Sequence, residues 1–339
     1  MKFGLLFSFI YEEGQPQLDT FREMDTILPL AEELGFDSFH TTEHHFQPNG
    51  WAPSPLMVLA KAAGLTTKMR LATNIMTLPL YNPLRLIEDL ATLDNLCEGR
   101  LTIGVAPGYA SEELHAYNVP LEERFGRFEE TLNLLELAWN GEPFEWHGRY
   151  FNVDAAQIVP RPVQEKLPVW YGVSGPKLLE RAAKRRVPVT ASPRHTSEEL
   201  KQHFAHYGRV AAELGYVPEE RPVIREVFVA ETQEEAERIA APAIMNMFSL
   251  YGRKSQEGER ALRDDKGNLI EDAGMVEFRT FASRYIVGDP ASCIEQLRLL
   301  DSEVAPTELV ARMQLPGVAT ADFERSLRLF AQEVMPAFR

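Results

Sequence analysis

The chain has 339 residues, of which 45% are hydrophobic and 25% are charged. These fractions are ordinary for a folded globular protein and exclude disorder along the whole chain. The 50 acidic and 35 basic residues give a formal net charge of −15. This charge argues against nucleic acid and anionic membranes as partners, because both are bound through clusters of Lys and Arg. No run of about 20 apolar residues is present, so we expect no membrane-spanning helix.

The two cysteines, Cys97 and Cys293, lie far apart in the sequence. They give neither a disulfide framework nor the close spacing of metal ligands, so we expect no metal site. A chain without a disulfide framework fits the reducing cytoplasm.

Short β-branched or aromatic runs alternate with longer helical patterns along the chain. The predicted strands are 2–10, 36–42, 69–77, 100–106, 167–173, 187–192, 222–230 and 307–315. The predicted helices are 19–34, 53–66, 83–97, 122–140, 176–185, 197–214, 232–248, 290–302 and 321–335. Apolar strands that alternate with helices indicate a parallel sheet covered on both faces. Eight such units favour a (β/α)8 TIM barrel over an open sheet, and we expect a single domain over residues 1–339.

Two insertions interrupt this alternation. Residues 141–166, after the fourth strand, are typical of a short hairpin with a Pro-rich return. Residues 249–285, between the seventh and eighth predicted strands, are far longer than an ordinary βα loop of about 2–6 residues. Their first half is charged and contains glycines, and their second half carries Met275, Phe278, Phe281 and Tyr285 at helical spacing. We expect a mobile lid there, with a solvated insertion as the alternative.

Ligands of TIM barrels bind at the C-terminal ends of the strands. After the second predicted strand come His44 and His45, which could bind a metal, act on a proton or pack as hydrogen-bonded structural residues. No further metal ligands accompany them, and a histidine at this end of a strand favours a functional role.

The turn after the fifth predicted strand is a second candidate site. There Ser174 and Gly175 precede Pro176 and Lys177 at the start of a helix, an arrangement that can bind an anion. An ordinary βα turn with Ser174 as the helix N-cap explains the same residues.

Several motifs together resemble one family. They are MKFG at 1–4, EHHF at 43–46, LPLYNP at 78–83, GVAPG at 104–108, RFGRFEE at 124–130, VGDP at 287–290 and SLRLFAQEVMP at 326–336. In this order and spacing they resemble the bacterial-luciferase-like, flavin-dependent monooxygenases over nearly the whole chain.

The resemblance implies a barrel that uses FMN as FMNH2 and is commonly a homodimer. It places the catalytic histidine at His44 and a non-proline cis bond at Asn74–Ile75, under the flavin ring. It places the FMN phosphate at Ser174, Gly175 and Lys177, and we assign Tyr109 and Val173 to the same cofactor site. The chain departs from the luciferases at Pro107, where they have an arginine near the phosphate, and at Ala106, where they have a reactive cysteine.

These features predict a two-component monooxygenase that uses O2 and FMNH2 from a separate NAD(P)H:flavin reductase. His44 would handle a proton while a flavin C4a-(hydro)peroxide oxygenates a small apolar substrate, with an aldehyde or ketone favoured. The candidates for the substrate pocket are Phe9, Phe46, Trp51 and Met76, although aromatic residues also line barrel cores. Two alternatives stay open, namely a deazaflavin (F420)-dependent hydride-transfer enzyme and a non-catalytic flavin-binding protein.

Overall fold

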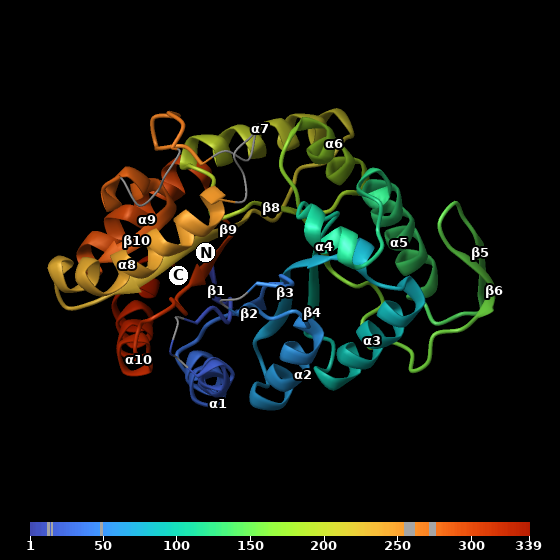
Figure 1. Cartoon of the computed structure of the whole chain (residues 1–339), viewed down its shortest axis with the longest axis horizontal. Helices are drawn as coiled ribbons and strands as arrows, with labels where there is room; N and C mark the ends of the chain where they lie inside the picture. Colours follow the sequence, from blue (N-terminus) through green and yellow to red (C-terminus); the bar gives the residue numbers. More distant parts are fainter. Residues whose placement is uncertain (12–13, 15, 48–49, 254–261, 271–275) are drawn as a thin grey trace. The chain divides into compact units, whose positions relative to one another are not determined.

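The computed structural model describes the chain except for residues 12–13, 15, 48–49, 254–261 and 271–275. The chain divides into two compact units, one formed by Met1–Asp37 with Val173–Arg339 and the other by Ser38–Gly172. Each unit combines parallel strands with helices (Figure 1), which confirms the predicted α/β class. The single domain and the closure of eight strands into one barrel stay predictions. Among the described helices, none combines the length and the apolar character needed to cross a bilayer.

The unit Ser38–Gly172 is built around four parallel strands in the order β2-β3-β4-β7. They are β2 (Ser38–Thr41), β3 (Arg70–Thr77), β4 (Leu101–Ala106) and β7 (Val169–Gly172). The helices are α2 (Pro55–Leu65), α3 (Pro83–Leu96), α4 (Ser111–Ala116) and α5 (Arg124–Ala138), with 3-10 turns at Leu78–Leu80 and Leu121–Glu123. Figure 1 shows α2 and α3 beside these strands. Strands β2, β3 and β4 are buried at nearly every position, as expected for parallel strands covered on both faces.

A two-stranded antiparallel hairpin occupies part of the 141–166 insertion, with β5 (Phe144–His147) paired to β6 (Asn152–Ala156). Glu130 of α5 fixes it, because its carboxylate accepts hydrogen bonds from the Trp146 indole and from the backbone N–H groups of Tyr150 and Phe151. In Figure 1 the hairpin lies next to α5.

The other unit contains five described strands, of which four pair in parallel in the order β10-β9-β11-β1. Its strands are β1 (Lys2–Phe7), β8 (Val189–Thr190), β9 (Pro222–Val229), β10 (Tyr285–Gly288) and β11 (Glu308–Arg312). Its helices are α1 (Gln17–Glu33), α6 (Pro176–Arg185), α7 (Ser197–Glu213), α8 (Gln233–Arg253), α9 (Pro290–Val304) and α10 (Thr320–Leu329), with short helical turns at Phe278–Arg284, Phe330–Val334 and Met335–Phe338. Phe3 and Phe7 of β1 pack edge-on or tilted against Phe330 and Phe323 in its core.

The second half of the 249–285 insertion differs from the helix that its spacing suggested. Residues Phe278–Arg284 form a 3-10 helix, and Tyr285 already belongs to strand β10, which was not predicted. The strand was missed because it has only four residues and directly follows the helical turn. Met275 lies outside the described residues.

Candidate active site

The tandem histidines follow the end of β2, in the unit Ser38–Gly172. His44 is partly exposed, with 17% of its side chain accessible, whereas His45 is buried. The two rings therefore have different surroundings and different hydrogen-bond partners.

His44 is oriented by one carboxylate and two aromatic rings. Its Nδ1 lies 3.3 Å from Oε1 of Glu113. The ring centroid lies 4.4 Å from that of Trp51 and 6.0 Å from that of Tyr109, both nearly perpendicular. With Nδ1 directed at a carboxylate, Nε2 is the ring nitrogen that can exchange a proton with a ligand.

Glu113 was not among the residues singled out from the sequence. It lies on α4, a six-residue helix that was also not predicted, and its side chain is buried. Burial acts to raise the pKa of this carboxyl, but the hydrogen bond and charge of His44 and the N–H of His45 outweigh burial and lower the pKa below its usual value. Glu113 is therefore the anionic partner that fixes the His44 ring. The acidic pair Glu112–Glu113 after the fourth strand was the available signal.

His45 is part of a buried network behind His44. Its Nε2 lies 2.7 Å from Oε1 of Glu43, and the hydroxyl of Tyr117 lies 3.0 Å from its Nδ1. Oε2 of Glu43 accepts hydrogen bonds from the Thr77 N–H and the Tyr81 hydroxyl. Burial raises the pKa of the Glu43 carboxyl, although the hydrogen bond and charge of His45 act against it. This network joins the EHHF segment to the end of β3.

The end of β3 forms a bulge beside this network. The peptide bond between Asn74 and Ile75 is cis, which confirms the prediction, and the pairing of β3 with β4 changes register between Thr73 and Met76. Asn74 and Met76 are buried, and Ile75 is half-buried.

Two glycines make room for the Ile75 side chain. A Cβ at Gly172 of β7 would lie 2.6 Å from Ile75 Cγ2, and a Cβ at Gly104 of β4 would lie 3.3 Å from the same atom. The bulge therefore depends on the absence of side chains at these two positions of its own sheet.

The turn before α6 lies in the other unit. Val173 is buried, Ser174 and Gly175 are half-buried and Lys177 is exposed. Gly175, with φ 86°, is the N-cap of α6, which corrects the assignment of Ser174 to that position. Glycine is favoured there because the backbone is left-handed and brings no side chain across the first turn. The main-chain N–H groups at this end of α6 suit an anion such as a phosphate.

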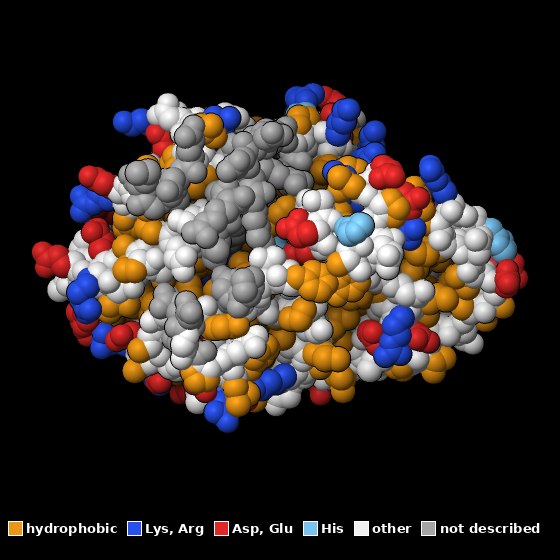
Figure 2. Space-filling model, in the orientation of Figure 1, with side chains coloured by type: hydrophobic (Ala, Val, Ile, Leu, Met, Phe, Trp, Pro, Cys, Tyr) orange, Lys and Arg blue, Asp and Glu red, His pale blue; other side chains and the backbone are white. Residues whose placement is uncertain are grey.

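The predicted pocket residues are distributed over both units. Trp51 is buried against His44, and Met76 is buried in β3. Phe46 is 66% exposed and its ring lies near those of His45 and Tyr117. Phe9 belongs to the other unit, where it is buried and stacked on Phe21. Figure 2 shows hydrophobic side chains beside charged ones where α4 reaches the surface.

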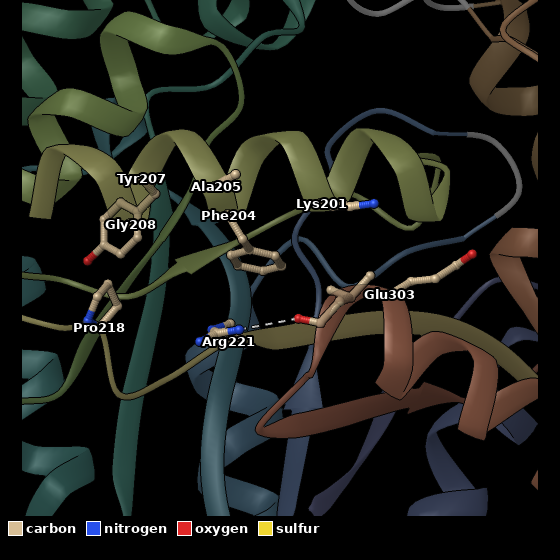
Figure 3. A pocket seen from close by; sticks show the side chains of 9 residues that line it. Lys201, Phe204, Ala205, Tyr207, Gly208, Pro218, Arg221 and Glu303 are labelled. Carbon is tan, nitrogen blue, oxygen red and sulfur yellow. Dashed lines mark hydrogen bonds between the residues drawn. The ribbon is translucent and has the colours of Figure 1, made fainter. Parts of the chain in front are cut away.

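A separate groove of about 300 Å³ lies between α7 and the end of α9 (Figure 3). Phe204 and Tyr207 line it together with the charged Lys201, Arg221 and Glu303, and Arg221 donates a hydrogen bond to the Val304 carbonyl. No predicted site residue lines this groove. Within the described part of the chain, no cluster of His, Cys, Asp and Glu has the arrangement of a metal site.

Comparison with known proteins identifies related sequences and folds. The family model described as luciferase-like monooxygenase matches residues 1–305. The oxygenase component of flavin-dependent trigonelline monooxygenase from Acinetobacter baylyi is 25% identical over 100% of this chain and 96% of its own length. The F420-dependent glucose-6-phosphate dehydrogenase of Nakamurella multipartita is 33% identical over 94% of this chain and 92% of its own.

A solved structure has the same fold. The oxygenating constituent of 3,6-diketocamphane monooxygenase from Pseudomonas putida, solved with FMN, superposes with a TM-score of 0.82 at 22% identity, covering 100% of this chain and 99% of that one.

Proposed function

This chain belongs to the luciferase-like monooxygenase family of oxidoreductases, and from that premise we propose that it is the oxygenase of a two-component system that uses FMNH2 and O2. The substrate is a small apolar molecule, with an aldehyde or ketone favoured. The observation that carries the proposal is the Glu113–His44 pair, which lies beside a bulged, glycine-lined strand end in one compact unit.

The chain's own residues would bind the cofactor and hold one proton. Reduced FMN, when bound, supplies the electrons for activation of dioxygen. The Ile75 bulge would support the flavin ring, with Asn74 and Tyr109 beside it, and the N-terminal turn of α6 with Lys177 would hold the phosphate. Because Pro107 stands where the luciferases have an arginine, Lys177 would supply the positive charge at the phosphate.

His44 is the group that moves a proton. Glu113 keeps a hydrogen on Nδ1, so Nε2 is free to take a proton from the reacting group and to return it. Trp51, buried against the ring, limits the access of water on that side.

We further propose that the described part of 249–285 is a lid. Buried Arg284 holds it, because its guanidinium donates hydrogen bonds to the carbonyls of Arg263 and Arg194 and pairs with Asp265 at 3.1 Å. Arg284→Lys keeps the charge but not the fork of donors, so we expect intact folding and more hydrogen peroxide released per NADH. Tight coupling in that variant would refute the lid.

Three further parts of the proposal concern partners and location. A separate NAD(P)H:flavin reductase supplies the FMNH2; in support, the Acinetobacter relative is itself the oxygenase component of its enzyme, which implies a second component. We propose a homodimer and a cytoplasmic location, the latter because Cys97 and Cys293 are buried free thiols.

A deazaflavin enzyme is the second candidate, and the 33% identity to an F420-dependent dehydrogenase favours it. The two candidates differ in cofactor preference. Titration of the purified chain with FMN and with F420, each followed by fluorescence, tests this directly. Tighter binding of FMN supports the monooxygenase, and binding of F420 with none of FMN overturns it.

A further inference from the structure

Helix α4 contacts both tandem histidines through side chains four residues apart. Glu113 reaches Nδ1 of His44 at 3.3 Å, and Tyr117, the C-cap residue of α4, reaches Nδ1 of His45 at 3.0 Å. Residues at this spacing lie on one face of a helix, so a single short element sets the positions of both rings.

The Tyr117 hydroxyl meets Nδ1 of His45, on the side of the ring opposite to Glu43. Glu43 already accepts two hydrogen bonds at Oε2, and its Oε1 lies 2.7 Å from Nε2 of His45. A carboxylate is an acceptor, so the hydrogen of the neutral ring is on Nε2 and Nδ1 has a free lone pair. The Tyr117 hydroxyl then donates to Nδ1.

His45 is in turn coupled to His44 through one oxygen atom. The backbone N–H of His45 donates to Oε1 of Glu113 at 3.2 Å, and the same oxygen holds Nδ1 of His44. A shift of His45 therefore moves the acceptor that orients His44. Tyr117 lies at the outer end of this chain of contacts and is 42% exposed.

We infer that Tyr117 is a positioning residue for His44, acting through His45 and Glu113; its effect on turnover rests on the proposed function. Tyr117 does not touch the reacting atoms. Its hydroxyl holds the His45 ring in place through Nδ1, and the position of His45 in turn sets that of the Glu113 oxygen.

The alternative is that Tyr117 only packs. Its ring lies 4.9 Å from that of His45 and 6.0 Å from that of Phe46. Phenylalanine keeps both ring contacts and removes only the hydroxyl, so Tyr117→Phe separates positioning from packing.

The matched control is Tyr216→Phe. The Tyr216 hydroxyl lies in the other unit, where it donates a 2.8 Å hydrogen bond to the Ala183 carbonyl and lies 3.3 Å from the Tyr207 hydroxyl. This variant therefore also removes a partly buried phenol hydroxyl together with its hydrogen bonds. Thermal unfolding of both variants measures the structural effect that they share.

The first readout is the nitrogen-15 NMR spectrum of the histidine rings in the cofactor-free protein, assigned with His44→Ala. The wild-type protein should show His45 with its hydrogen on Nε2 and His44 with its hydrogen on Nδ1. Tyr117→Phe should shift the ring-nitrogen signals of His45 and of His44, and Tyr216→Phe should shift neither. A wild-type His45 with its hydrogen on Nδ1, or unchanged His44 signals in Tyr117→Phe, overturns the inference.

The second readout is steady-state oxygenation. Loss of one hydrogen bond to a positioned group predicts a kcat about five- to tenfold lower in Tyr117→Phe with KM unchanged. If the wild-type protein oxygenates a substrate and Tyr117→Phe and Tyr216→Phe have equal kcat, the inference is contradicted although the proposed function holds. If the NMR changes occur and no variant or wild-type protein oxygenates, the inference about positioning stands and the proposed function fails.

Discussion

Gly172→Ala should damage the bulge of β3 without touching either histidine. The added Cβ would lie 2.6 Å from Cγ2, 3.0 Å from Cδ1 and 3.3 Å from Cβ of Ile75. The two shortest separations are closer than side chains normally approach, and a β-branched side chain has few other rotamers.

The expected cost is that of overpacking a core, about 1–3 kcal/mol of unfolding free energy. Because the bulge is also the proposed flavin support, we expect FMN to bind roughly tenfold more weakly, equivalent to about 1.4 kcal/mol. Gly64→Ala in α2 is the control, since its Cβ would meet nothing within 4 Å. In a helix that change should be neutral or stabilising by up to about 1 kcal/mol.

Chemical denaturation and quenching of FMN fluorescence measure both effects on the same samples. Unchanged stability and FMN affinity in Gly172→Ala would show that the reasoning about the bulge is wrong. Lost stability with unchanged FMN affinity would keep the packing account and remove the bulge from the cofactor site.

Four further variants test the site. His44→Ala should fold and bind FMN but lose substrate oxygenation, and unimpaired turnover would refute its role. Glu113→Gln removes the anion that fixes Nδ1 of His44. Because hydrogen bonds to charged groups contribute about 1.5–3 kcal/mol, kcat should fall by about tenfold or more while the affinity for FMN is retained. An unchanged pH–rate profile would argue against this role of Glu113. Ser174→Asp should weaken FMN binding by placing negative charge beside the phosphate, and equal affinity would place the phosphate elsewhere. Burial in the folded state raises the pKa of the Glu43 carboxyl above 4.5, so the native protein keeps this proton to a higher pH than the unfolded protein does. The unfolding free energy therefore falls as the pH rises from about 4.5. Glu43→Gln should therefore show a smaller fall in unfolding free energy from pH 4.5 to 7, and an identical pH dependence would contradict the raised pKa.

The α/β alternation could be read from the sequence because buried parallel strands and their helices have distinct lengths and patterns. Strand β10 could not be predicted, because its four residues directly follow a helical turn and continue the apolar spacing of that turn. The position of His44 followed from the end of β2. The contact between His44 and Glu113 could not be predicted, because it joins residues 69 positions apart and depends on a helix of six residues, which is too short to show a helical hydrophobic period. At the start of α6, Ser174 and Gly175 are both acceptable N-caps in sequence, and only the left-handed backbone of Gly175 decides between them.

The location of the oxygen atom after turnover tests the central claim most directly. Wild-type protein and His44→Ala are supplied with FMN, NADH, a flavin reductase, oxygen-18 gas and a panel of apolar aldehydes and ketones, and products are analysed by mass spectrometry. We predict one oxygen-18 atom in the product of at least one carbonyl compound with the wild-type protein and none with His44→Ala. Absence of labelled product throughout the panel, together with substrate-dependent reduction of F420 by the same protein, would contradict the account.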